Sequence, residues 1–442
     1  MPSFLYKTQW NMINVLGKRK KCMLTILITC TFIYWLLNMK NVQNLKQHVL
    51  VEPCDDNETK GVISQICHLY KAKEIVGDLC APLCENNLVT YTKCLNYKYS
   101  KYIIQVQCRH LCNTQQIVPA VLKMKRINGS NVNDYLVYSG LDLLALLSKR
   151  SSIASYNLQE YIITSRNLSI LTADLLKNEY GFFAREGQDI LSLLWGDDYA
   201  DYFKGTKTNL LFARSYWSAV KQNELRISRI FDDWDVFPEV YGTCGPLYIT
   251  EHNPSLKSLD KYFSFLRAEF PPWNQRAKLA IEILHFVQKT DAMEHSLHLC
   301  DIKSPHFGFT VGNTVKFIDA ETVLADEAFN RDMSALKCNA HKDCAIFDCE
   351  GLCDFNTHRC LPMRINNNLQ TVCNKVFRGT IFSSVGGLLY SPPHKFAEKI
   401  ISLINHCADM EQKEGKVVLK KPGQEILSDL KQILMESIDG QH

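Results

Sequence analysis

Short apolar runs and longer amphipathic stretches alternate along this chain, and the change in spacing predicts a mixture of strands and helices. Runs rich in Val, Ile, Leu and Tyr, separated by polar turns, predict three successive strands in an antiparallel meander, at residues 88–95, 102–108 and 117–125. Similar runs predict two later strand pairs, at 236–241 with 246–250 and at 307–311 with 314–318. The second of these pairs flanks the turn residues Gly312 and Asn313.

Apolar residues at helical spacing predict the helices. Residues 210–231 contain neither Gly nor Pro and predict one amphipathic helix, and residues 274–289 predict another that follows the start signal of Pro271 and Pro272. Other helical stretches are expected around 141–148, 168–177 and 189–195, with a polar loop at 197–209, and two terminal helices are expected near 394–407 and 424–437. The fold class predicted from this mixture is α+β.

One segment near the amino terminus predicts a membrane span. Residues 22–39 contain eighteen residues without a charge, and a helix of that length covers about 27 Å. A cleaved signal peptide would have a shorter apolar region and a cleavage site of small residues, so a retained signal anchor is the better interpretation. The basic residues at 18–21 place residues 1–21 in the cytosol and the rest in the lumen, which is type II topology.

Cysteine usage supports an oxidising compartment, because sixteen of the eighteen cysteines follow the predicted span. They form two groups, Cys54, Cys67, Cys80, Cys84, Cys94, Cys108 and Cys112, then Cys338, Cys344, Cys349, Cys353, Cys360 and Cys373. Disulfides are favoured over metal binding by Cys80 with Cys84 or Cys349 with Cys353, because no companion His pair is present. The odd count of the first group requires a free cysteine or a partner elsewhere, such as Cys244, Cys300 or Cys407.

Composition and charge narrow the class of protein. Apolar residues make up 46% and charged residues 22% of the chain, which is typical of globular proteins. The net charge of +4 is small and no stretch is saturated with Lys and Arg, so a nucleic-acid partner is not expected. Glycosylation sequons at Asn57, Asn128 and Asn167 agree with a lumenal body.

The segment 299–321 carries the candidate chemistry. Asp301 follows a predicted helix, Lys303 lies two residues on, and the strand pair at 307–318 delivers Asp319. This order resembles a protein-kinase catalytic loop followed by its metal-binding Asp. The resemblance implies that Asp301 orients a substrate hydroxyl, with Lys303 beside the transferring phosphate, and that Asp319 holds magnesium.

Two upstream residues extend the same resemblance. Lys123 in AVLKMK is similar to the nucleotide-binding Lys on the third strand of kinases, and Glu224 on the helix at 210–231 is similar to its ion-pair partner. Taken singly, Lys123 has an ordinary explanation as a strand-edge charge, Glu224 as a solvated helix face and Asp319 as a turn residue. Their shared order and spacing favour the kinase interpretation.

Longer motifs across residues 54–437 resemble the divergent protein kinase domain 1 family, cysteine-rich type II membrane proteins of the endoplasmic reticulum. The motifs are CAPLCENNLVTYTKCL, GTCGPLYITEH and CNAHKDCAIFDCEGLCD followed by RINNNLQTVC. The resemblance implies a bilobal protein-kinase-like fold in the lumen of the endoplasmic reticulum, with the Golgi as the alternative. It also implies ATP with Mg²⁺ or Mn²⁺ as cofactors if the domain is active.

Boundaries follow from the span, the cysteine groups and the resemblance. We expect a cytosolic tail at 1–21, the anchor at 22–39, a stalk and cysteine-rich segment at 40–87, an N-lobe at 88–252 with an insertion at about 129–209, and a C-lobe at 253–442 with a cysteine-rich insertion at 338–373.

Several positions depart from the kinase pattern. No glycine occurs between Gly77 and Gly129, so the glycine-rich loop that covers the phosphates is missing. His306 stands where kinases carry the Asn that binds a second metal, and we assign it to the metal site beside Asp319 although imidazole is a poorer magnesium ligand than an amide oxygen. Cys300 replaces the usual Arg before Asp301.

The family also tends to carry a calcium-binding loop ahead of the helix that bears the Glu. In the corresponding segment of this chain, residues 195–212, Phe212 stands where a bidentate Glu belongs. Calcium requires six to eight oxygen ligands including that carboxylate, so Ca²⁺ is not expected here.

Three functions remain open. The first is a lumenal kinase that transfers phosphate to a hydroxyl of an unidentified protein or glycan in the secretory pathway. The second is a pseudokinase scaffold, which the missing glycine loop and His306 favour. The third is a disulfide-stapled module that binds a secretory partner through its cysteine-rich regions.

Overall fold

The computed structural model describes residues 55–98, 101–112, 116–126, 132–150, 163–181, 189–203, 206–256, 271–293, 296–310, 312, 314–378, 387–409, 412–413, 416–417 and 423–440. The predicted span at 22–39 and the sequon at Asn128 lie outside these ranges. Among the helices within them, none has the length and apolar character that a bilayer crossing needs. The compact unit that these ranges build runs from Asp56 to His442.

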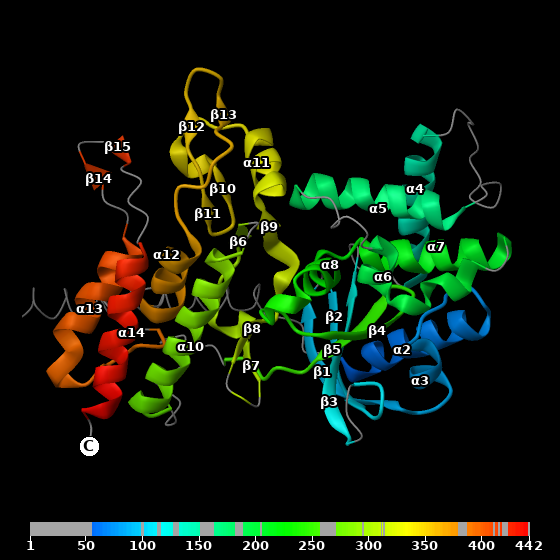
Figure 1. The fold of residues 1–442 in the computed structure, drawn as a ribbon, viewed down its shortest axis with the longest axis horizontal. Coiled ribbons are helices and arrows are strands. Elements are labelled where there is room, and N and C mark those ends of the chain that lie inside the picture. The colour runs from blue at the N-terminus through cyan, green and yellow to red at the C-terminus, as the bar shows by residue number, and fades with distance from the viewer. Residues whose placement is uncertain are drawn as a thin grey trace, which may run out of the picture. The chain divides into compact units, whose positions relative to one another are not determined.

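A five-stranded antiparallel sheet organises the first half of this unit (Figure 1). Its strands are β1 (Val89–Lys98), β2 (Lys101–Cys108), β3 (Val118–Lys125), β4 (Val240–Cys244) and β5 (Leu247–Glu251), in the order β1-β2-β3-β5-β4. The predicted three-strand meander is confirmed as β1 to β3. Lys101 pairs with Lys125 and Ile103 with Lys123 across β2 and β3, so these four side chains share one face of the sheet.

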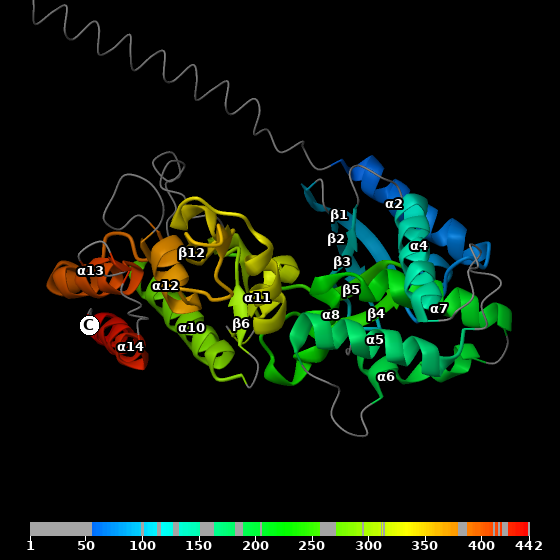
Figure 2. The same ribbon diagram turned by 90° about the horizontal axis from the view of Figure 1, so that it is seen from above.

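Helices surround this sheet in both views of the ribbon (Figures 1 and 2). They are α2 (Asp56–Lys71), α3 (Cys80–Cys84), α4 (Val132–Arg150), α5 (Ser165–Tyr180), α6 (Ile190–Trp195), η2 (Asp197–Phe203), α7 (Thr206–Val220), α8 (Asn223–Ile230) and η3 (Asp232–Trp234). The helices expected around 141–148, 168–177 and 189–195 are confirmed as α4, α5 and α6. The expected polar loop at 197–209 is wrong, because η2 and the start of α7 occupy most of it.

The single helix expected over 210–231 is also wrong, because the chain leaves helical geometry at Gln222. Gln222 has extended backbone angles, with φ −87° and ψ 112°. Its side chain accepts a hydrogen bond from Lys125 N at 2.6 Å and donates one to Pro246 O at 2.6 Å. Contacts with the sheet therefore outweigh local helix propensity, and they make α8 a separate helix.

The strand expected at 236–241 begins later, at Val240. Val236 and Phe237 are buried in the core instead, and Phe317 N donates a hydrogen bond to Val236 O at 2.9 Å. Pro238 has no N–H for a strand ladder, which explains why pairing starts only after it.

The second half of the unit is mainly helical. It contains α10 (Trp273–Asp291), β6 (Leu297–Leu299), η4 (Ser304–His306), β7 (Phe307–Phe309), β8 (Val315–Phe317), η5 (Ala320–Thr322), β9 (Val323–Ala325), α11 (Asp326–Ala335), α12 (Asn368–Val372), the π-helix η7 (Cys373–Arg378), α13 (His394–Ala408), β14 (Gln412–Lys413), β15 (Lys416–Val417) and α14 (Gln424–Asp439). Phe286 of α10 packs on Phe307 and Phe317, with ring centroids 5.7 and 6.1 Å apart. This aromatic contact fixes the β7–β8 hairpin on the helical core.

Disulfides hold the cysteine-rich segments, as predicted. Seven are found within the described ranges: Cys67–Cys84, Cys80–Cys244, Cys108–Cys112, Cys300–Cys349, Cys338–Cys353, Cys344–Cys360 and Cys373–Cys407. The odd count of the first group is explained by Cys244, which pairs with Cys80. In the second group, Cys349 and Cys373 also find partners outside it.

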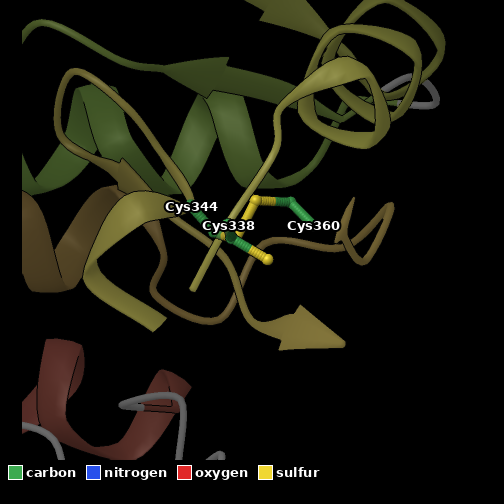
Figure 3. A group of neighbouring side chains, drawn as sticks. All are labelled: Cys338, Cys344 and Cys360. Carbon is green, nitrogen blue, oxygen red and sulfur yellow. A yellow bond between two sulfur atoms is a disulfide. The ribbon is translucent and has the colours of Figure 1, made fainter. Parts of the chain in front are cut away.

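The cysteine-rich insertion has little regular structure of its own. It contains η6 (His341–Asp343) and two short hairpins, β10 (Ala345–Ile346) with β11 (Cys349–Glu350) and β12 (Cys353–Asp354) with β13 (Arg359–Cys360). The sulfur atoms of Cys338, Cys344 and Cys360 lie within 4.8 Å of one another. Figure 3 shows the Cys344–Cys360 bond, and Cys338 bonds to Cys353, so none of these three is a thiolate that could ligate a metal.

Phe212 lies at the centre of the core between α6, η2 and α7. It is fully buried, and the rings of Trp195, Tyr202 and Phe203 have centroids within 5.1 to 5.2 Å of its own. The residue that occupies the place of a calcium-binding Glu is thus an aromatic packing residue.

We predict that Phe212→Ala lowers the free energy of unfolding by about 3–5 kcal/mol, because it leaves a cavity among these three rings. Guanidinium unfolding with the disulfides intact measures this loss. Phe347→Ala is the control, since Phe347 is 69% exposed, and its expected change is within about 0.5 kcal/mol. Equal losses for the two variants would contradict the packing role of Phe212.

Candidate functional site

Lys123 and Glu224, predicted as partners from positions a hundred residues apart, meet in the structure. Lys123 projects from β3 and is 4% exposed, and Glu224 lies in the first turn of α8 and is 5% exposed. Lys123 Nζ donates a hydrogen bond to Glu224 Oε1 and a second one, at 2.9 Å, to Ile318 O. The break at Gln222 positions this pair, because it starts α8 at Asn223 and so places Glu224 in the first turn of that helix.

A second lysine, which the sequence analysis missed, enters the same cluster. Lys101 begins β2 and is 5% exposed. Its ammonium donates to Asp319 Oδ1 and, at 3.1 Å, to Glu224 Oε2, and it lies 3.9 Å from Glu321 Oε2. Burial alone lowers the pKa of Lys101, but the Glu224 and Asp319 carboxylates outweigh burial and raise this pKa above its ordinary value. Lys101 is therefore charged throughout the physiological pH range.

The sequence did carry a signal for Lys101, but only in combination with the hairpin register. Lys101 lies two residues before Ile103, and Ile103 is paired with Lys123. Alternation along a strand then puts Lys101 on the same face as Lys123. Without the register, a lysine at the start of a strand is indistinguishable from a solvated turn residue.

Asp319 follows β8 and stands between Lys101 and His306. Its Oδ2 lies 3.3 Å from His306 Nε2, and His306 Nδ1 lies 2.8 Å from the carbonyl oxygen of Asp301. Because a carbonyl can only accept, Nδ1 carries a proton, and Nε2 can donate to Asp319 only in the imidazolium form. His306 thus links the backbone of the Asp301 loop to the Asp319 carboxylate.

Asp301 and Lys303 form the outer part of the site. Lys303 Nζ lies 2.7 and 2.9 Å from the two carboxylate oxygens of Asp301. The Lys303 side chain is 58% exposed, whereas that of Asp301 is 17% exposed. Asp301 therefore presents a partly accessible carboxylate that an exposed ammonium holds from outside.

The cysteine-rich insertion holds the backbone on both sides of Asp301. Asp348 accepts a hydrogen bond from Ile302 N at 2.9 Å through its side chain, and its own N–H donates to Cys300 O at 2.7 Å. The Cys300–Cys349 disulfide covers the same junction, and Lys375 pairs with Asp348 at 3.3 Å. The insertion, remote in sequence from the predicted strand pair, is thus part of the framework of the site.

Four of the site residues, Lys123, Lys303, His306 and Asp319, line a cavity of about 510 Å³. Its wall combines an apolar part with a polar one, and consists of Leu95, Ile103, Val121, Lys123, Pro238, Glu251, His252, Asn253, Ser255, Lys303, Pro305, His306, Ile318 and Asp319. Burial lowers the pKa of His252, with a further contribution from Lys93, so this imidazole is neutral near pH 7. A volume of this size matches a small-molecule ligand.

Asn253 differs from the other polar residues of the cavity wall. It is 5% exposed, and neither its Oδ1 nor its Nδ2 has a hydrogen-bond partner among the described residues. A Cβ added to Gly308 would lie 2.6 Å from the Asn253 Cβ, so the glycine allows β7 to approach Asn253 closely. A buried carboxamide without partners costs about 1–3 kcal/mol per group, which a bound ligand can recover.

The charges around Asp319 are balanced by the protein's own side chains. Three carboxylates, Glu224, Asp319 and Glu321, face three lysines, Lys101, Lys123 and Lys125, and the Lys125–Glu321 contact measures 4.0 Å. Magnesium requires oxygen ligands with surplus negative charge. Lys101 already occupies one Asp319 oxygen and His306 faces the other, so the predicted Asp319–His306 donor set does not fit Mg²⁺ or Mn²⁺ in this arrangement.

Two of the predicted glycosylation residues can be placed. Asn57 lies exposed on α2, while Thr59 of its sequon is buried and lies 3.0 Å from the Tyr91 hydroxyl. Asn167 lies exposed in the first turn of α5. Both asparagines are thus on the surface of the folded unit.

Glu224 is the shared partner of two buried lysines, so its removal has a predictable cost. We expect Glu224→Gln to lower the free energy of unfolding by about 3–5 kcal/mol, since Lys123 loses its carboxylate and Lys101 keeps Asp319 and the more distant Glu321. Glu321→Gln is the matched control, because this side chain is 32% exposed and its ion pairs are worth less than about 1 kcal/mol. Guanidinium unfolding compares the two variants, and a loss for Glu224→Gln that does not exceed the loss for Glu321→Gln would refute the shared role.

Asp348→Ala tests the support of the Asp301 loop. The Ile302 N–H loses its acceptor, which lowers the free energy of opening of this loop by about 1–3 kcal/mol. Amide hydrogen exchange in residues 297–306 should therefore accelerate by about tenfold or more. Asp354→Ala in the same insertion is the control, because the Asp354 side chain bonds, within the described residues, only Asn356 and Thr357 of its own turn. Unchanged exchange in Asp348→Ala would show that the loop is held without this contact.

Two models of one protein family match separate parts of the chain. The protein-kinase domain of FAM69 matches residues 216–410, which include Glu224, Asp301, Lys303 and Asp319. The amino-terminal, cysteine-rich domain of the endoplasmic reticulum from the same family matches residues 15–106 and ends at β2. The two matches together support the family resemblance found in the sequence. The chain belongs to the FAM69 family of kinase-like proteins, the divergent protein kinase domain 1 family.

Proposed function

We propose that this protein is a lumenal, bilobal kinase-like domain that binds ATP in the cavity between the sheet and the β7–β8 hairpin. The observation that carries the proposal is that Lys123 and Asp319 both line that cavity, and that Glu224 from a third element holds the Lys123 ammonium. A Lys–Glu pair beside a carboxylate after a hairpin is the arrangement with which kinases hold nucleotide phosphates.

The cavity wall supports an orientation for the nucleotide. The apolar residues Ile103, Val121 and Ile318 suit a planar base, whereas Lys123 and Lys303 suit the phosphates. The Asn253 carboxamide offers one donor and one acceptor, and adenine presents the complementary pair on its edge. ATP in this orientation would give Asn253 the partners that it lacks among the described residues.

The outer part of the site supports phosphate transfer. In the proposed reaction, a hydroxyl oxygen attacks the γ-phosphorus, the bond from that phosphorus to the bridging oxygen breaks, and ADP leaves with that oxygen. Asp301 accepts the hydroxyl proton, and Lys303 neutralises charge on the transferring group. His306 holds the Asp301 backbone in place through its bond to the carbonyl oxygen.

The cellular compartment of the protein limits the class of substrate that it can meet. The description of the amino-terminal family model supports the endoplasmic reticulum, and the disulfides support an oxidising compartment. We therefore propose type II insertion through residues 22–39, glycosylation of the sequons, and a protein or glycan of the secretory pathway as the hydroxyl donor.

A pseudokinase scaffold is the second candidate. It is favoured by Lys101, which occupies an oxygen of Asp319, and by His306, which stands in place of a metal-binding amide. In this case the cavity would bind nucleotide without transferring phosphate.

Nucleotide binding is tested with the full-length chain, folded oxidatively and purified in detergent. ATP should raise the melting temperature, because ligand at a hundredfold excess over Kd raises the free energy of unfolding by about 2.7 kcal/mol. Lys123→Met should remove a phosphate contact, and Val121→Phe should fill the base slot without changing charge. If ATP stabilises all three proteins equally, or stabilises none, the nucleotide site is wrong.

Phosphate transfer is tested separately with γ-labelled ATP, as autophosphorylation and hydrolysis. Asp301→Asn should retain the thermal shift and lose the transfer by about 100-fold or more, the contribution of a general base. Binding in the parent with no transfer above the Asp301→Asn level would reject the kinase and leave the scaffold.

A further inference from the structure

We infer that Asn223 is a positioning residue for the proposed nucleotide site, because its side chain clamps α8 to the turn after Asp319 and so holds together the two acceptors of the Lys123 ammonium. The inference rests on the proposed function and deepens it, since it names the residues that keep Lys123 in place for the phosphates. Three observations carry it: the bonds of the Asn223 carboxamide, the origin of the two Lys123 acceptors, and the contacts of α5.

The Asn223 carboxamide joins two separate elements. Asn223 is the first residue of α8. Its Nδ2 donates, at 2.9 to 3.3 Å, to three carbonyl oxygens of the turn at 320–323, which belong to Ala320, Glu321 and Val323. Carbonyl oxygens can only accept, so these contacts settle which end of the carboxamide faces the turn. We call these bonds the Asn223 clamp.

Lys123 depends on this clamp, because its two acceptors come from the two elements that the clamp joins. Lys123 Nζ donates to Glu224 Oε1 on α8 and, at 2.9 Å, to Ile318 O, which lies two residues before the turn. Glu224 directly follows Asn223 in α8. Lys123 is 4% exposed and lines the cavity. A displacement of α8 from the turn would therefore separate the two groups that orient this ammonium.

Two buried side chains support the oxygen of the same carboxamide. Asn223 Oδ1 accepts a hydrogen bond from the Tyr180 hydroxyl at 2.8 Å and another from Arg226 Nη2 at 3.2 Å. Arg226 Nη1 donates to Val220 O at 2.6 Å, and Nε lies 3.4 Å from the Tyr180 hydroxyl. Tyr180 is 2% and Arg226 5% exposed. Each polar group of this network has a partner, and a satisfied buried network is rigid.

The helix α5, which belongs to the predicted insertion, thereby takes part in positioning. Tyr180 ends α5, and α5 also packs against β9 and α11 (Figures 1 and 2). An ordinary kinase positions the helix of its Glu through its activation loop. In the described range 314–378, no loop separates β9 from α11, because β9 ends at Ala325 and α11 begins at Asp326. The contacts of α5 and Asn223 hold α8 and the turn together in this arrangement.

The experiment is a double-mutant cycle on ATP affinity, measured with a ribose-labelled fluorescent ATP and the full-length chain in detergent. Asn223→Ala should weaken binding by about fivefold or more in the parent and by less than about twofold in a Lys123→Met background, because the clamp acts through Lys123. Equal losses in the two backgrounds would overturn the inference. If Lys123→Met itself leaves the affinity unchanged, the nucleotide site is wrong and the inference falls with it, so the two failures are distinguishable.

Tyr180→Phe tests the support from α5, and it replaces Asn223→Ala in the cycle if that variant does not fold. It should weaken ATP binding by about threefold, the loss of one neutral hydrogen bond behind the clamp. Tyr216→Phe is the matched control, since the Tyr216 hydroxyl is equally buried and lies 3.0 Å from Thr172 Oγ1 of the same helix. Its affinity should stay within about twofold of the parent. Equal losses in the two phenylalanine variants would overturn the support from α5.

Hydrogen exchange provides a readout that requires no nucleotide. Asn223→Ala should accelerate amide exchange in residues 320–325 by about tenfold or more, because the turn loses its bonds to α8. Tyr216→Phe should leave exchange in these residues unchanged. Exchange in Asn223→Ala that matches the parent would show that the turn is held without the clamp, against the inference.

Discussion

The candidate site depends on one interaction, the Glu224 carboxylate held between two buried ammonium groups. Lys123 approaches from β3 and Lys101 from β2, and each of the three side chains is 4 to 5% exposed. Unpaired charges at such depth would cost several kcal/mol each, so the carboxylate requires both the sheet register and the start of α8. The same pair of lysines brings Asp319 and the carbonyl oxygen of Ile318 to the sheet.

The parts of the chain that surround this interaction have separate structural duties. Phe286 packs against Phe307 and Phe317 of the β7–β8 hairpin, and this contact positions Asp319, which follows the hairpin. Asp348 and the Cys300–Cys349 bond hold the loop that carries Asp301. The cysteine-rich insertion therefore supports the candidate site as well as the stability of the fold.

Charge distinguishes this site from that of an ordinary kinase. Here three lysines balance three carboxylates before any ligand binds, whereas an ordinary kinase keeps its metal-binding carboxylate open. The departures noted in the sequence, the missing glycines and His306 in place of Asn, belong to the same change in electrostatics.

The sequence by itself determined the features that depend on local pattern or on chain order. Alternation predicted β1 to β3, and helical spacing with Pro271 and Pro272 predicted α10. Cysteine number predicted that the first group has a free cysteine or a partner elsewhere, and the structure identifies that partner as Cys244. Kinase order brought Lys123 and Glu224 together correctly, because those motifs encode a shared fold. Only the tertiary structure decided the break at Gln222, the entry of Lys101 and the support from Asp348. Each depends on a contact more than twenty residues away along the chain, and local propensity contains no information about such contacts.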